Sequence, residues 1–268
     1  MNTLSGMVRC HAGYGAKSVS DAASFFPRAV IFDYFGTLTS AVRQGPTHRW
    51  MARSLGCDPD AWLKLMAETF YERASGRLGD PIDVLRHLAA RLGASPSGQA
   101  LRLVRAQRIA AIACDGPLRR EAVPVLRALR NRGLRTAVVS DCWYELPVLL
   151  PGLPVHPLLD ARVFSVEVGR CKPDPQMYHV ACERLRVAPR ECLYVGDGGS
   201  RELTGARAVG MRAVRLAAPD LADHLSFAPD DQFRGPIVTS LADLVPLVDG
   251  LRRRPNSDLD CCSARIGA

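Results

Sequence analysis

The segment RAVIFDYFGTL, residues 28–38, decides how the rest of the sequence is interpreted. Its first part is a short apolar run bounded by polar or turn-forming residues, which is typical of a buried parallel strand. Asp33 follows the run directly, and Gly36 permits a tight turn just beyond it. We therefore expect a buried strand whose carboxyl end presents the carboxylate of Asp33.

Strand-like and helix-like segments alternate from Pro117 onward, which predicts a doubly wound parallel sheet. The expected strands cover residues 135–139, 192–195 and 212–216, and the expected helices cover 121–131, 175–185, 202–209 and 239–251. Together with the first strand they predict an α/β, Rossmann-like core made of residues 28–40 and 116–250.

Residues 41–115 have a different pattern, with apolar side chains at helical spacing and no strand-like alternation. Trp50, Trp62 and Phe70 belong to these apolar positions, and Asp58-Pro59-Asp60 is a signal for the start of a helix. The pattern predicts a small all-helical cap, of about four helices, inserted after the first strand. Residues 1–27 and 251–268 lack a sustained period, and we interpret them as a flexible leader and a flexible tail.

The overall composition favours a cytoplasmic protein that binds neither nucleic acid nor a membrane. The formal net charge is +8, but the arginines are spread along the chain, which argues against nucleic acid as a partner. No stretch approaches the roughly 20 apolar residues of a membrane span. The nine cysteines show no zinc spacing, so we expect reduced thiols. Both a monomer and a homodimer are compatible with the sequence.

Three of the expected strands end in polar residues, namely Asp33, Ser140 and Asp197, and Lys172 lies in a loop just before a helix. Ligands of such sheets bind beyond the carboxyl ends of the strands. Taken singly, Asp197 can be a helix N-cap, Ser140 a turn residue and Lys172 a solvated side chain. Taken together they predict a site, and two adjacent carboxylates predict a hard divalent cation, with Mg²⁺ the first choice.

Four motifs in order resemble the haloacid dehalogenase-like hydrolase superfamily. They are the segments DYFGTL at 33–38, VVSD at 138–141, KPDP at 172–175 and VGDGGSRE at 195–202, the last followed by TGARAVGM at 204–211. The resemblance covers roughly residues 28–220. A helical insert between the first and second motifs is the mark of the subgroup with a helical cap.

The resemblance implies a role for each motif residue. Asp33 would be the nucleophile, Ser140 would bind the transferring group, and Lys172 would neutralise charge and keep Asp33 ionised. The implied Mg²⁺ ligands are Asp33, Asp197 and the backbone carbonyl of Phe35, with Glu202 in contact directly or through water. The implied substrate is a small phosphorylated molecule, with no further organic cofactor.

Phe35 departs from the pattern of the phosphatases in this superfamily, which carry a second Asp at this position as the general acid and base. Loss of such a group typically costs about 10²–10⁴ in rate. Asp141 and Glu145 are candidates to replace it. The resemblance thus leaves two alternatives open. One is a metal-independent dehalogenase acting on a halogenated acid, because dehalogenases carry Tyr at this position. The other is a non-catalytic protein that binds a phosphorylated ligand or another protein.

Overall fold

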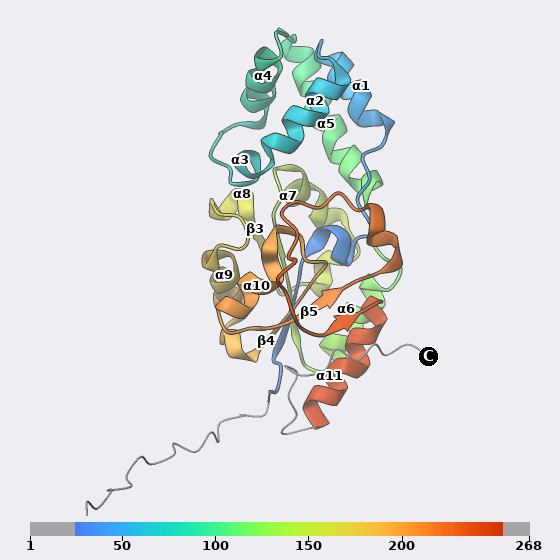
Figure 1. The fold of residues 1–268 in the computed structure, drawn as a ribbon, viewed down its shortest axis with the longest axis vertical. Coiled ribbons are helices and arrows are strands. Elements are labelled where there is room, and N and C mark those ends of the chain that lie inside the picture. The colour runs from blue at the N-terminus through green and yellow to red at the C-terminus, as the bar shows by residue number, and fades with distance from the viewer. Residues whose placement is uncertain (1–24, 254–268) are drawn as a thin grey trace, which may run out of the picture.

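The computed structural model describes residues 25–253, with the side chain of Arg253 left undescribed, and it centres on one parallel sheet of six strands (Figure 1). The strand order is β3-β2-β1-β4-β5-β6, and all five pairings are parallel. The strands are β1 (Ala29–Phe32), β2 (Arg135–Ser140), β3 (Ala161–Phe164), β4 (Cys192–Gly196), β5 (Arg212–Leu216) and β6 (Ile237–Val238). The chain therefore winds outward from β1 first on one side and then on the other.

Successive side chains of β1 enter two different apolar clusters, because side chains alternate between the faces of a strand. Val30 and Phe32 pack in the cluster that includes α6 and α11, whereas Ala29 and Ile31 pack in the cluster that includes α9 and α10. Helices thus cover both faces of the sheet. The helices that follow β2 are α7 (Glu145–Leu149), α8 (Ser165–Val168), α9 (Pro175–Leu185), α10 (Glu202–Ala208) and α11 (Leu244–Arg253).

The insertion between β1 and β2 is entirely helical and contains α1 (Pro46–Ser54), α2 (Pro59–Glu68), α3 (Phe70–Ala74), α4 (Pro81–Arg91), α5 (Gly98–Asp115) and α6 (Ala122–Asn131). The side chains of Asp58, Asp80 and Ser97 cap the amino ends of α2, α4 and α5, and satisfy backbone N–H groups that the helices leave free. An apolar cluster around Trp62 and Leu101 joins α1, α2, α4 and α5 at one end of the molecule (Figure 1), whereas α6 packs against the sheet.

The predicted fold class, a doubly wound parallel sheet with a helical insertion after the first strand, is confirmed. Within 41–115 the structure has five helices rather than about four. The last predicted helix, 239–251, begins later, because residues 241–243 form a 3₁₀ turn before α11. The strands β3 and β6 were not predicted, because Arg162 interrupts the apolar run of β3 and β6 has only two residues.

The proposed division into leader, core, cap and tail remains a prediction. Residues 1–24 and 254–268 of the predicted leader and tail lie outside the described residues. Phe25 is buried against the core cluster, and residues 251–253 belong to α11. Within residues 25–253, no helix combines the length and the apolar composition that a bilayer span requires.

Candidate active site

Asp33 stands at the point where the winding of the sheet reverses. Its strand β1 lies between β2 and β4, and the backbone N–H of Asp33 donates to the carbonyl of Val195 at 2.9 Å. A tight turn over Tyr34–Leu38 follows, in which Gly36 has φ +77°. Open α/β sheets bind ligands at such a reversal, beyond the carboxyl ends of the strands. The Asp33 side chain therefore lies where sheets of this kind bind their ligands.

Lys172 joins two buried carboxylates. Its ammonium group donates to Oδ1 of Asp33 and to Oε2 of Glu202, both at 2.6 Å, and the exposed fractions of the three side chains are 3%, 6% and 0%. The loop that carries Lys172 is tied to the end of β2, because its backbone N–H donates to Oδ1 of Asp141 at 2.9 Å. The first three motifs are thus connected by hydrogen bonds.

The Glu202 carboxylate accepts from two further donors, the hydroxyl of Tyr194 at 2.9 Å and the backbone N–H of Gly198 at 3.1 Å. The carboxylate lies directly on Gly196, where a Cβ atom would come within 1.9 Å of Oε1. A larger residue at position 196 would displace it. Glu202 is therefore a fixed anchor for Lys172 rather than a side chain free to move.

Asp197 completes a group of three carboxylates. Oxygen atoms of Asp33, Asp197 and Glu202 all lie within 4.8 Å of one another, and this group could hold a metal ion. Oδ1 of Asp197 also accepts from the N–H of Gly199 at 3.0 Å, which fixes its direction. The three donor atoms are all carboxylate oxygens, the ligands that Mg²⁺ prefers. The chemistry of the donor set therefore fits the predicted ion.

The charges of this group affect one another strongly. Burial raises the pKa of Asp33 to about 6, against the opposing effect of Lys172, and the neighbouring Asp197 adds to the rise. Burial would lower the pKa of Lys172, but Asp33 and Glu202 together hold it well above its ordinary value. Burial and the charge of Asp33 raise the pKa of Glu202 well above its ordinary range. Three carboxylates thus share one ammonium group, and their repulsion favours a proton or a cation among them.

The remaining predicted residues are placed differently. Ser140 ends β2 and is fully buried, with its hydroxyl 3.5 Å from the carbonyl of Asp141, but it does not line the cavity that contains Asp33. The Phe35 ring does line this cavity and packs edge-on against Tyr34, at 4.9 Å between ring centroids. The role of the Phe35 carbonyl as a metal ligand stays a prediction.

Sequence reasoning missed His224, which lies in the loop between β5 and β6 with no motif around it. Its Nε2 is 3.3 Å from Oδ2 of Asp197, and its Nδ1 accepts from the backbone N–H of Val42 at 2.8 Å. Because Nδ1 is an acceptor, the neutral ring carries its proton on Nε2, facing Asp197. A Cβ at position 36 would lie 2.7 Å from the same Nε2, so Gly36 leaves room for the ring.

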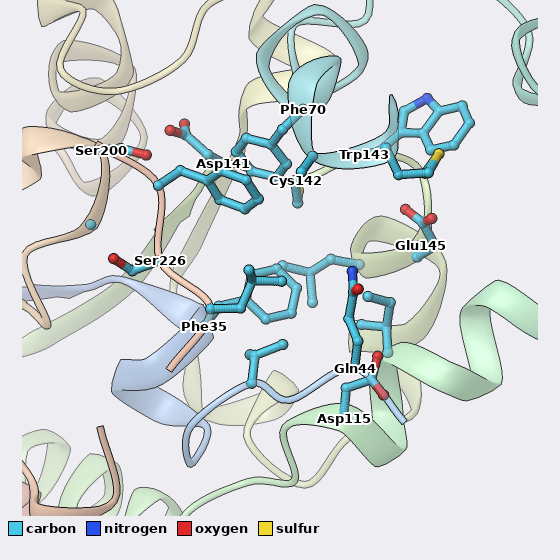
Figure 2. Close-up of a pocket in the computed structure, with 18 of the residues that line it drawn as sticks. Phe35, Gln44, Phe70, Asp115, Asp141, Cys142, Trp143, Glu145, Ser200 and Ser226 are labelled. Carbon is cyan, nitrogen blue, oxygen red and sulfur yellow. The ribbon is translucent and has the colours of Figure 1, made fainter. Parts of the chain in front are cut away.

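A cavity of about 170 Å³ connects this group to the helical insertion. Figure 2 shows Phe35 and Phe70 projecting into it, with Trp143 and Glu145 on the opposite side from Ser200. Phe70 of the insertion stacks on Phe227 of the core, with centroids 4.0 Å apart and the rings within 3° of parallel. The cap and the core therefore share the walls of one cavity.

The comparison with known families decides the class of this protein. Residues 27–210 match the family model of the haloacid dehalogenase-like hydrolases. The chain belongs to this family. The helical insertion after β1 agrees with the cap expected of the subgroup, and the resemblance noted from the four motifs is confirmed.

Individual members of the family are similar to this chain over different lengths. A bovine (Bos taurus) protein named haloacid dehalogenase-like hydrolase domain-containing protein 3 is 35% identical over 132 residues, which are 48% of this chain and 51% of that protein. A phosphoserine phosphatase of Thermus thermophilus is 37% identical over 101 residues, 37% of this chain and 40% of that protein. The chain spans about half the length of the first curated relatives it matches.

Among solved structures, the L-2-haloacid dehalogenase of Xanthobacter autotrophicus with chloropropionic acid covalently bound has a similar fold, with a TM-score of 0.59. The alignment covers 84% of this chain and 99% of that chain, at 22% sequence identity. The haloacid dehalogenase-like family therefore contains phosphatases and dehalogenases that are similar to this chain, and the fold does not distinguish between them.

Proposed function

We propose that this hydrolase is a Mg²⁺-dependent phosphatase or phosphotransferase that acts on a small molecule through Asp33. One observation carries the proposal: three carboxylates, of the buried Asp33 and Glu202 and the half-buried Asp197, lie within 4.8 Å of one another beside a single ammonium group. When all three are ionised, two negative charges lack a counter-charge, and burying them without a partner is costly. A divalent cation would balance them, and a metal-independent dehalogenase has no need for the carboxylate of Asp197.

In the proposed reaction a carboxylate oxygen of Asp33 attacks the phosphorus atom, and the bond from phosphorus to the leaving oxygen breaks as the new bond forms. Lys172 keeps Asp33 ionised and neutralises charge on the phosphoryl group, while Glu202 holds Lys172 in place. We assign Ser140 a hydrogen bond to the transferring group. Water then hydrolyses the aspartyl phosphate and regenerates Asp33.

The residues that would hold Mg²⁺ are Asp33, Asp197 and the carbonyl of Phe35. Glu202 already accepts from Lys172, Tyr194 and Gly198, so we expect it to act through Lys172 or a bridging water. When bound, the ion would neutralise part of the negative charge of the phosphoryl group.

The leaving oxygen takes the electron pair of the broken bond and normally needs a proton. Phe35 supplies none, and Glu145 is engaged by Arg108 at 2.6 Å. The remaining candidate is Asp141, which lines the cavity and whose Oδ2 has no hydrogen-bond partner within the described residues. A leaving group that is stable as an anion avoids this requirement, so we expect acyl or aryl phosphates to be better substrates than alkyl phosphates. The similarity to a phosphoserine phosphatase supports phosphate esters as the substrate class.

The test is turnover of 4-nitrophenyl phosphate by the wild type with Mg²⁺, with EDTA, and with Mg²⁺ restored. We expect EDTA to abolish turnover reversibly, and Asp33→Asn to lower it by at least about 10³-fold. Asp231→Asn, which removes an exposed carboxylate, is the control and should leave the rate unchanged. Turnover that is indifferent to both EDTA and Asp33→Asn would contradict the proposal.

Phe35 favours one alternative, the cleavage of a carbon–halogen bond, because its aromatic ring lines the cavity beside Asp33. Halide release from 2-chloropropionate in EDTA would support this alternative, and its absence over a pH series would count against it. Binding of phosphate or beryllofluoride without turnover of any substrate would instead support a non-catalytic protein.

A further inference from the structure

The cap side of the cavity carries a buried cation that makes no ion pair with a carboxylate of the described chain. Arg73 of α3 and Arg108 of α5 are 4% and 6% exposed and both line the cavity. Their guanidinium carbons lie 5.1 Å and 5.3 Å from the centre of the Trp143 ring, within the range of a cation–π interaction. Within residues 25–253, the carboxylate that lies within ion-pair distance of either arginine is that of Glu145.

The carboxylate of Glu145 pairs with the guanidinium group of Arg108. Its Oε1 accepts from Nε of Arg108 at 2.6 Å and lies 2.6 Å from Nη2, so two guanidinium nitrogens converge on one carboxylate oxygen. Within residues 25–253, Arg73 has no acidic group within ion-pair distance. Its two hydrogen bonds go to neutral acceptors, the carbonyl of Met66 and the hydroxyl of Thr69, the latter at 3.3 Å. Three of the five N–H donors of Arg73 are left without a partner in the described chain.

The two arginines respond differently to the same burial. Burial disfavours the charged form of both guanidinium groups, yet the carboxylate of Glu145 holds the pKa of Arg108 above its ordinary value. For Arg73, burial and the charge of Arg108 together lower the pKa to about 9. A buried cation with unpaired donors is unfavourable by itself, and an anion brought by a ligand would relieve it.

We propose that Arg73 forms a second anion-binding subsite, and that the natural substrate carries a carboxylate at the end remote from its phosphoryl group. Arg73 and Asp33 line one cavity, so a single molecule can reach both. The planar guanidinium fork matches a carboxylate in two-pronged geometry. This inference rests on the proposed function, because it assumes that the phosphoryl group lies at Asp33.

The size and lining of the cavity restrict the part of the substrate between the two anions. A cavity of about 150 Å³ in another protein holds one benzene molecule, and this one has a similar volume of about 170 Å³. Its lining includes apolar side chains such as Phe35, Phe70, Leu63 and Met66. The connecting part is therefore compact and apolar, and the limited volume favours a carboxylate over a second phosphate.

Binding of non-hydrolysable phosphonates tests the subsite without relying on turnover. Phenylphosphonate is compared with 3- and 4-carboxyphenylphosphonate by calorimetry on the wild-type protein in Mg²⁺. We expect at least one carboxylated compound to bind about tenfold more tightly, the effect of one charge-assisted hydrogen-bonded pair. In Arg73→Gln this preference should disappear, while the affinity for phenylphosphonate stays the same.

The matched control is Arg102→Gln, which removes an exposed guanidinium from the same cap and should retain the preference. Equal binding of all three phosphonates by the wild type would overturn the subsite even if Arg73→Gln failed to fold. A preference that survives in Arg73→Gln would overturn the role of Arg73. If phenylphosphonate shows no Mg²⁺-dependent binding at all, the proposed function fails instead, so the two failures are distinguishable.

Discussion

The two ends of the cavity have opposite charge imbalances. At the core end, the carboxylates of Asp33, Asp197 and Glu202 share the single ammonium group of Lys172. At the cap end, two buried guanidinium groups lie against the Trp143 ring, and the carboxylate of Glu145 pairs with Arg108 alone of the two. A buried charge needs a partner. The core end is thus suited to a cation, the cap end to an anion, and a substrate with two different ends would bind in one orientation.

Removing the ammonium group at the core end should have the largest effect. We expect Lys172→Met to lower kcat for 4-nitrophenyl phosphate by about 10²–10³-fold, as for the loss of one charge-stabilising donor. In EDTA it should also lower the free energy of unfolding by about 3 kcal/mol, because buried carboxylates lose their partner. Lys64→Met, which removes an exposed lysine, is the control for both measurements.

The loss of stability in Lys172→Met should depend on pH. Burial already raises the pKa of Asp33 to about 6, and without Lys172 it would rise further. A carboxylate whose pKa is raised in the folded state destabilises that state fully above the folded pKa, and this penalty declines as pH falls from the folded pKa towards the unfolded value. Urea unfolding in EDTA should therefore show a larger deficit at pH 8 than at pH 5. An equal deficit at both values would mean that the carboxylates are not coupled to Lys172.

The corresponding change at the cap end is Glu145→Gln, which leaves two buried guanidinium groups without an anion. We expect it to lower the free energy of unfolding by about 3 kcal/mol. Arg73→Gln should cost clearly less, because it removes the cation that has no carboxylate partner. Urea unfolding of the two variants measures the difference. Similar losses would show that Arg73 shares Glu145 with Arg108, and the proposed imbalance at this end would be wrong.

Between the two ends, Phe35 occupies the position of the missing general acid. We expect Phe35→Asp to raise the turnover of an alkyl phosphate by about 10²-fold, since a positioned acid then protonates the leaving oxygen. The gain should be smaller for 4-nitrophenyl phosphate, whose leaving group needs less protonation. Phe35→Asn has nearly the same shape and no acidic proton, so it is the matched control. An equal gain in Phe35→Asn would mean that the smaller side chain makes room for the substrate, rather than that an acid transfers a proton.

The smallest expected effect concerns His224, which contacts Asp197 from the loop between β5 and β6. We expect His224→Ala to weaken Mg²⁺ binding about tenfold, the usual cost of losing a group that orients a metal ligand. Calorimetric titration of the protein with Mg²⁺ measures this change. His179→Ala removes an exposed imidazole from α9 and should leave the affinity unchanged. Unchanged affinity in His224→Ala would exclude a role in placing Asp197.

The amino-acid sequence by itself predicted the parallel sheet, the helical insertion and the approach of Asp33, Lys172 and Asp197 to one another. These features are local: a buried strand shows an apolar run, and the polar residue that ends it follows directly in the sequence. The parallel arrangement then brings the strand ends to one edge of the sheet. The register of β1 with β2 and β4 confirms this reasoning residue by residue.

The tertiary structure alone decided which distant residues face this edge. His224 contacts Val42, 182 positions away, and the Arg108–Glu145 pair spans 37 positions, so no local period reveals either contact. Arg73 resembles every other arginine of the cap in sequence, and only packing shows that it is buried without a carboxylate. Burial and pairing depend on the whole fold, so the charge balance at the two ends of the cavity could not be obtained from the sequence.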